Sequence, residues 1–139
     1  MKEYITLDQY FAQSPTLDLI LISSAKDLLI KVNSLLEELG CDSVTMTSGY
    51  RDPTHNSAIG GAPNSKHTKA QAIDIADNDR VIGQKLLMRM DLLRARGCAI
   101  EDLNYCVLKN GNKWIHIQSV LPSSGRSVFI PYSGPIVLK

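Results

Sequence analysis

The chain has 139 residues, 44% of them hydrophobic, which is long enough for one domain with a single core and too short for two. Fifteen Lys and Arg residues stand against 14 Asp and Glu residues, for a net charge of +1. A balance this close to neutral provides no long-range field toward nucleic acid or an anionic membrane. We therefore expect a single domain over residues 1–139 that binds neither.

The three cysteines, Cys41, Cys98 and Cys106, form no C-x-x-C pair. An odd number without paired spacing argues against a disulfide framework and favours a reducing compartment. The N-terminal stretch MKEYITLDQYFAQSP lacks the continuous apolar core and small-residue cleavage site of a signal peptide. The longest apolar run, around Leu17 to Ile22, is too short to cross a bilayer. We expect synthesis in the cytoplasm without a signal peptide.

The first third of the chain predicts two helices. Thr6 can cap a short helix, with Gln9 completing a capping box. Further on, apolar residues recur at steps of three and four and end before Gly40. This spacing predicts an amphipathic helix, starting at residue 23 or 24 and ending at Leu39, that covers one side of a sheet.

Residues 43–47 alternate in polarity and predict a strand that leads into the sequence SGYR. Arg51 would then lie just past a strand end, where functional side chains often sit on a rigid support. In residues 52–65 two prolines, two adjacent glycines and two asparagines argue against regular structure over most of the length. Loops this long are usually functional or disordered, and between Arg51 and His67 we favour a functional one.

Two later strands each place a polar residue among apolar ones. In QAIDI, Ala72 and Asp74 share one face, and an aspartate there is unfavourable unless it is paired. In KWIHIQ, Trp114, His116 and Gln118 share one face, and the preceding Asn-Gly pair at residues 110–111 predicts a hairpin turn. Two strands therefore offer polar ligands to a common face.

The other segments complete an α+β pattern. Residues 77–79 can cap a second helix, whose apolar stripe runs over 81–93 and which Gly97 closes. Short strands are predicted at 98–101 and 105–108, and edge strands at 128–130 and 136–138. The expected fold is a small antiparallel sheet with helices packed mainly on one side.

Imidazole and carboxylate are both good zinc donors, and three protein ligands with one open position is the catalytic arrangement. Any single histidine is more often a surface or satisfied core residue, and nothing in the spacing requires His55 as a ligand. From spacing alone, the histidines and the aspartate could also be coincidental in an α+β domain.

A family resemblance adds to this pattern. Ser65, His67, Ala72 and Asp74 resemble the S-x-H-x(4)-A-x-D signature of the zinc D-alanyl-D-alanine carboxypeptidases and L-alanyl-D-glutamate endopeptidases, relatives of the Hedgehog signalling domain. SGYR before it and WIHI after it fit the same family, and the similarity runs from about residue 44 to about residue 132. The resemblance implies a Hedgehog-like fold in which zinc is bound by His67, Asp74 and His116.

The same resemblance implies roles for the residues around the metal. Arg51 and Ser65 would contact the substrate, and Arg51 would hold or polarise its carbonyl or carboxylate, which suits a charged planar fork. Glu101 looks like the glutamate that precedes the tryptophan-histidine strand in related sequences and would be the general base, with Asp102 as the immediate competitor.

The implied function is a zinc peptidase that hydrolyses peptidoglycan stem peptides, either as a D-Ala-D-Ala carboxypeptidase or as an L-Ala-D-Glu endopeptidase. The chain departs from the family at Ala70, usually glycine, and at Lys113, where some members carry the acidic base. These departures motivate an alternative, a catalytically silent zinc-binding structural or cell-wall-binding module, for instance in a phage particle. A phage-encoded enzyme that is released to the cell wall would reconcile a wall substrate with the missing signal peptide.

Overall fold

The computed structural model describes residues 1–131. Its strands form one five-stranded sheet in the order β1-β2-β4-β3-β5. The strand bounds are Met46–Ser48 for β1, Ala72–Ala76 for β2, Ala99–Glu101 for β3, Trp114–Gln118 for β4 and Val128–Phe129 for β5. All neighbouring strands are antiparallel except β3 and β5, which are parallel.

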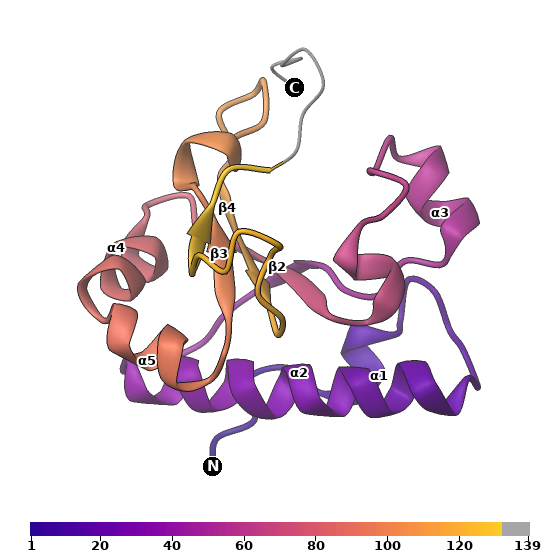
Figure 1. The fold of residues 1–139 in the computed structure, drawn as a ribbon, viewed down its shortest axis with the longest axis horizontal. Helices are drawn as coiled ribbons and strands as arrows, with labels where there is room; N and C mark the ends of the chain where they lie inside the picture. Colours follow the sequence, from indigo (N-terminus) through magenta and orange to yellow (C-terminus); the bar gives the residue numbers. More distant parts are fainter. Residues whose placement is uncertain (132–139) are drawn as a thin grey trace.

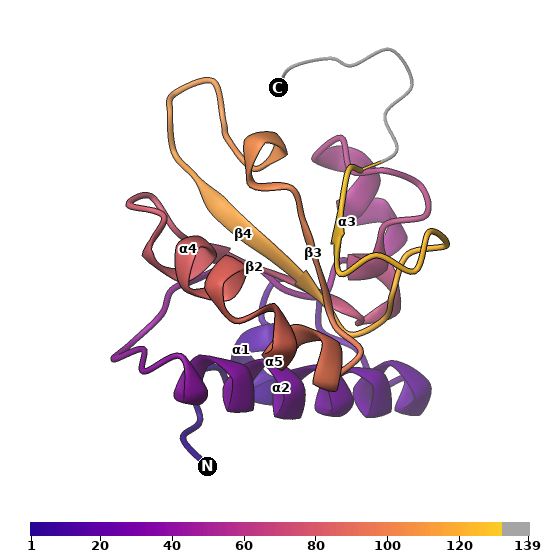
Figure 2. The same cartoon turned by 60° about the vertical axis from the view of Figure 1, so that its left-hand side comes forward.

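Within residues 1–131, five α-helices and two 3-10 helices accompany the sheet. They are α1 (Leu7–Tyr10), α2 (Leu19–Glu38), α3 (Pro53–Ala58), η1 (Lys66–Lys69), α4 (Val81–Met88), α5 (Met90–Ala95) and η2 (Leu103–Tyr105). Figures 1 and 2 show α2 along one side of the sheet with α5 beside it, and α3 at the opposite end of the molecule from α4. Within residues 1–131 no helix combines the length and apolar character that crossing a membrane requires.

One apolar core joins the helices to a single face of the sheet. Alternation along the strands points Ile73 and Ile75 of β2 and Ile115 and Ile117 of β4 into it, and all four are fully buried. Buried leucines of α2, α4 and α5 belong to the same cluster. The expected α+β fold, with helices mainly on one side of the sheet, is confirmed. The opposite face is left for polar residues.

The N-terminal helices follow their capping residues. The capping box of Thr6 and Gln9 is present at α1, as predicted. Helix α2 starts at Leu19, several residues before the predicted start. Asp18 causes this, because its Oδ1 accepts hydrogen bonds from the backbone N–H groups of Ile20 and Leu21 at 2.9 and 3.1 Å. Leu19 and Ile20 are exposed, whereas Leu21 and Ile22 pack against the core, so the apolar face of α2 begins one turn before the predicted start.

The segment 52–65 contains a helix that was not predicted. Helix α3 begins at Pro53, and the Asp52 carboxylate accepts a hydrogen bond from the backbone N–H of His55 at 2.7 Å. An aspartate N-cap followed by proline is a helix start signal, since proline has a suitable φ and needs no N–H partner there. The prolines and glycines therefore bound a short helix rather than exclude one.

The single helix predicted over residues 81–93 is wrong, because the chain forms two. It breaks at Arg89, whose φ and ψ are −130° and 49°, and restarts as α5 at Met90. The Arg89 guanidinium binds both carboxylate oxygens of Asp91, at 3.0 and 2.9 Å, in the first turn of α5. The N-cap residue of α4 is Arg80 rather than one of residues 77–79, although Asp77 accepts hydrogen bonds from two backbone N–H groups in the first turn.

Three strand predictions need correction. The first strand lies at Met46–Ser48 rather than at 43–47. The strand predicted at 105–108 is replaced by η2, which Asp102 caps, and by an isolated bridge between Val107 and Lys113. The sheet is not wholly antiparallel, because the long connection from β4 lets β5 run in the same direction as β3. The strand predicted at 136–138 lies outside the described residues.

Candidate metal centre

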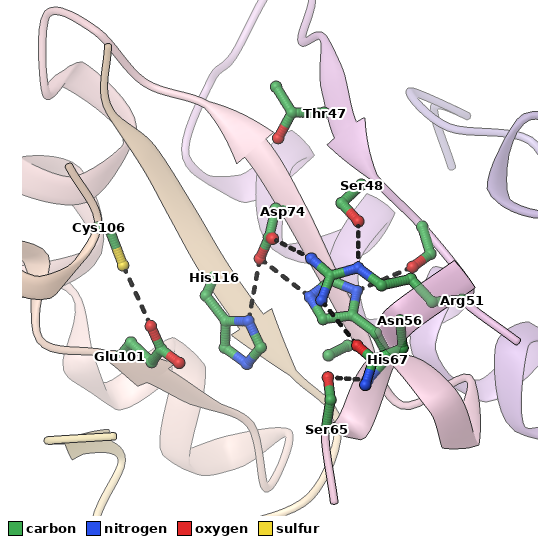
Figure 3. A network of polar contacts seen from close by, with 12 residues as sticks. Thr47, Ser48, Arg51, Asn56, Ser65, His67, Asp74, Glu101, Cys106 and His116 are labelled. Atoms are coloured by element: carbon green, nitrogen blue, oxygen red, sulfur yellow. Dashed lines mark hydrogen bonds and ion pairs between the residues drawn. The ribbon is translucent and has the colours of Figure 1, made fainter. Parts of the chain in front are cut away.

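The strand register sets a row of side chains across the face of the sheet opposite α2. One residue comes from each strand: Ser48, Asp74, His116, Glu101 and Phe129. Asp74 is paired directly with both Ser48 and His116, and Glu101 with Phe129. Because Ile100 is opposite Ile117, the same register continues to place Glu101 beside His116. Figure 3 shows Ser48, Asp74, His116 and Glu101 of this row.

His67 reaches the row from η1, which Ser65 caps by accepting a hydrogen bond from the His67 backbone N–H at 3.2 Å. Ala70 ends η1 with φ 55° and ψ 37°. The positive φ expected from the family's usual glycine is therefore present, although an L-residue pays about 1–2 kcal/mol for it. Gly49 lets the end of α1 pack closely against the SGYR segment: a Cβ at residue 49 would lie 2.2 Å from the Tyr10 carbonyl oxygen.

The structure brings His67, Asp74 and His116 together. Asp74 Oδ1 lies 3.0 Å from His116 Nδ1 and 3.2 Å from His67 Nε2, and the three donor atoms lie within 4.8 Å of one another. Ligands of a tetrahedral zinc ion with bonds of about 2.0–2.1 Å lie roughly 3.3 Å apart, so the two contacts have the spacing of shared ligands. All three residues are buried, with exposed fractions of 2%, 8% and 7%.

Hydrogen bonds on the outer side of each imidazole show which ring nitrogen faces the centre. His67 Nδ1 lies 2.8 Å from the Gly49 carbonyl oxygen, which can only accept, so this nitrogen carries the proton and Nε2 has the lone pair. His116 Nε2 lies 3.0 Å from Gln118 Oε1, and the Gln118 amide in turn donates to Val120 O. His116 therefore presents Nδ1 to the centre.

One nitrogen in this group lacks a partner. The contact between His67 Nε2 and Asp74 does not have hydrogen-bond geometry, so within residues 1–131 this buried nitrogen is without a hydrogen bond. Buried polar atoms are almost always satisfied, and an exception needs an explanation. A metal ion bound by His67, Asp74 and His116 would satisfy it, and two imidazoles with a carboxylate are a donor set that suits zinc.

Arg51 closes the group on the side of β1. Its backbone N–H donates to the carbonyl oxygen of His67 at 3.2 Å. Its guanidinium donates from Nε to Ser48 Oγ at 2.9 Å, from Nη1 to Asn56 Oδ1 at 3.3 Å and from Nη2 to Asp74 Oδ2 at 3.4 Å (Figure 3). Asp74 thus faces the histidines with one oxygen and the guanidinium with the other.

The charges in this group shift its titration. Burial alone would raise the pKa of the Asp74 carboxyl, but its contacts with His67 and His116 outweigh burial and lower that pKa. Burial likewise favours neutral His116, yet the hydrogen bond and charge of Asp74 raise the pKa of His116 from 6.5 to about 9. In the metal-free protein a proton on His116 therefore occupies the place of a cation.

This predicts a pH dependence for the metal-free protein. The pKa of His116 is raised above its unfolded value, so its stabilising effect is full below pH 6.5 and is lost as the pH rises through about 9. Urea unfolding of chelator-treated protein between pH 6 and 10 should show this loss, and the His116→Gln variant should lack it. An equal loss in both proteins would assign the effect to other groups.

Glu101 and Asp102, the two candidates for the general base, occupy different positions. Glu101 is partly exposed at the end of β3, and its Oε2 accepts a hydrogen bond from Cys106 Sγ at 3.4 Å. Burial and the neighbouring Glu101 raise the pKa of the Cys106 thiol, which keeps it protonated as the donor. Asp102 Oδ1 instead accepts from the backbone N–H of Asn104 and caps η2.

Three further residues have hydrogen-bond partners that define their positions relative to the three donors. His55 Nδ1 bonds to Ser14 Oγ at 3.0 Å and is not among the three grouped donors. Gln118 lies on the face of His116, as its strand position predicts, although the sequence indicates no role for it. Nothing local in the sequence marks Asn56, because its partner is an arginine in the preceding loop.

Comparisons with known proteins agree with this arrangement. The family model of peptidase M15 matches residues 7–118, a span that includes Arg51 and all three grouped donors. No curated protein matches the chain. The sequence resemblance to zinc peptidases is thereby confirmed at the level of the family. The chain belongs to the peptidase M15 family.

Proposed function

We propose that this protein is a zinc-dependent peptidase that hydrolyses the stem peptides of peptidoglycan, as a D-Ala-D-Ala carboxypeptidase or an L-Ala-D-Glu endopeptidase. The observation that carries the proposal is that the donor atoms of His67, Asp74 and His116 lie together in a buried group, in which His67 Nε2 has no hydrogen bond within residues 1–131. Membership of a peptidase family supports the reaction. The resemblance of the S-x-H-x(4)-A-x-D segment supports the substrate class.

His67 through Nε2, His116 through Nδ1 and Asp74 through Oδ1 would hold the ion. Zinc in such a site supplies Lewis-acid activation of a carbonyl group and of water. Gly49 and Gln118 keep the two imidazoles in the tautomers that this requires, through the hydrogen bonds at their far nitrogens.

Glu101 is the proposed general base. Its cross-strand position beside His116 supports this role, because it lies next to the proposed metal ligands, and the Cys106 thiol donates to its Oε2. Oε1 is then free to take a proton from the attacking water and to return it to the leaving amine. Asp102 is less suited, because its carboxylate already caps η2.

Arg51 and Ser65 are proposed to bind the substrate. The Arg51 guanidinium uses one N–H from each of its three nitrogens on the protein, which leaves two N–H groups for a carboxylate of the stem peptide. The Ser65 oxygen accepts from His67 N–H, and its own hydrogen remains able to donate to a substrate oxygen.

Incubating zinc-loaded protein with purified muropeptides tests the proposal. Release of D-alanine, or cleavage between L-Ala and D-Glu, is the expected result, and mass spectrometry of the products identifies the bond.

Lys113 lies three residues before His116, where some relatives carry the acid, and this position favours the silent zinc-binding module as the second candidate. Intact muropeptides after prolonged incubation with zinc-loaded protein would favour that module.

A further inference from the structure

Asn56 is a buried polar residue that connects the segment after SGYR to the candidate site. It lies in α3 with an exposed fraction of 3%. Its Oδ1 accepts from Arg51 Nη1 at 3.3 Å, and its Nδ2 donates to the carbonyl oxygen of Ala62 at 2.8 Å. One half of the amide therefore contacts Arg51, and the other half fastens the loop that follows α3.

Gly61 leaves the space that this amide fills. A Cβ at residue 61 would lie 2.0 Å from Asn56 Oδ1, the same atom that accepts from Arg51. The Gly61 backbone N–H also donates to the Asn56 carbonyl oxygen at 2.8 Å. The loop is thus closed over the Asn56 side chain. The contact between Asn56 and Arg51 depends on glycine at residue 61, since any side chain there would displace the amide.

The neutral amide has a consequence for the charge of Arg51. Ser48 and Asn56 hold the guanidinium with neutral oxygens, and Asp74 is its only ion-pair partner within residues 1–131. Asp74 also faces two histidines, so its charge is shared. A neutral partner fixes the orientation of a cation without cancelling the charge that an anionic ligand needs.

We propose that Asn56 is a positioning residue, which through Oδ1 holds the Arg51 guanidinium in the orientation that binds a carboxylate of the stem peptide. The proposal rests on the function proposed above for Arg51. Figure 3 shows Asn56 and Ser48 both in contact with the guanidinium. Asn56 acts before the substrate arrives, by preorganising the fork that receives it.

Side-chain NMR of Arg51 tests the orientation without any turnover. In the wild type, the held guanidinium should give separate ¹H–¹⁵N signals, assigned by their loss in Arg51→Lys. In Asn56→Ala the guanidinium should rotate freely, so that its signals average. In Asn56→Asp the signals should stay separate, because an oxygen acceptor for Nη1 remains. Two results would overturn the proposal. Separate signals that survive in Asn56→Ala would show that Asn56 does not hold the guanidinium. Loss of separate signals in both variants would show that the hydrogen bond to Ala62, rather than the Oδ1 contact, is what matters for Arg51.

Kinetics with the muropeptide that the wild type cleaves tests the consequence. Asn56→Ala should raise KM roughly tenfold, with kcat changed by less than about twofold, because the loss is in binding. Asn56→Asp should raise KM as well, since its carboxylate cancels the charge of Arg51. A fall in kcat at unchanged KM in both variants would contradict the proposal.

Two further variants separate positioning from damage to the fold. Gly61→Ala should reproduce Asn56→Ala in NMR and KM, because the added Cβ displaces the amide. Asn64→Ala, an exposed asparagine of the same segment, should behave as the wild type. If the wild type cleaves no muropeptide, the proposed function fails, and the NMR comparison still decides whether Asn56 positions Arg51.

Discussion

His67→Ala or His116→Ala is expected to remove stoichiometric zinc binding and all hydrolysis. Each histidine supplies one of the three donors grouped in residues 1–131, so its loss leaves only two of them. Loss of a metal's outer partners already costs 10–100-fold in affinity, so loss of a direct ligand should exceed about 100-fold. Calorimetric zinc titration of the chelator-treated variants measures this.

The chain provides its own control for these variants. It has three histidines, and the third, His55, bonds to Ser14 and is not one of the grouped donors. His55→Ala should bind one zinc with the affinity of the wild type. One equivalent of tightly bound zinc in His116→Ala would show that the ligand set is wrong.

Glu101→Gln is expected to keep zinc and to lose turnover. The amide has the size of the carboxylate but cannot accept a proton, and positioned general bases contribute about 10²–10⁴-fold to rate. The fall should be in kcat, measured with the muropeptide that the wild type cleaves, while metal analysis still finds one zinc per chain. Full activity in this variant would show that another group is the base.

Asp102→Asn is the matched control for Glu101, because it lies one residue further along the chain and caps η2. The substitution should lower the free energy of unfolding by about 1 kcal/mol or less, since asparagine also caps helices well. It should leave kcat unchanged. A large fall in kcat for Asp102→Asn with an unaltered melting temperature would transfer the role of base to Asp102.

The core and the row of polar residues could be predicted from local patterns. Alternation in QAIDI and KWIHIQ placed Asp74 and His116 on the face away from the isoleucines, as the strand pairing shows. The position of Glu101 beside His116 follows from how β3 pairs with β4, and the spacing of apolar residues does not specify that register. The resemblance, rather than periodicity, singled out Glu101.

Three of the differences from prediction share a physical origin in side-chain hydrogen bonds. The start of α2 was placed at residue 23 or 24 and α3 was not predicted, whereas Asp18 and Asp52 start these two helices by capping them. Asn56 was missed because its partners, Arg51 and Ala62, are brought to it by the turn of the segment rather than by any repeat. Side-chain hydrogen bonds of this kind leave little trace in hydrophobic spacing.

The central claim is that His67, Asp74 and His116 bind one metal ion together, and cobalt(II) titration of the chelator-treated protein tests it most directly. We predict saturation at one equivalent, with visible d–d bands of a four- or five-coordinate ion and no thiolate charge-transfer band, because the three cysteines are not among the grouped donors. Binding of no cobalt, or a spectrum with a cobalt–thiolate band, would contradict the claim.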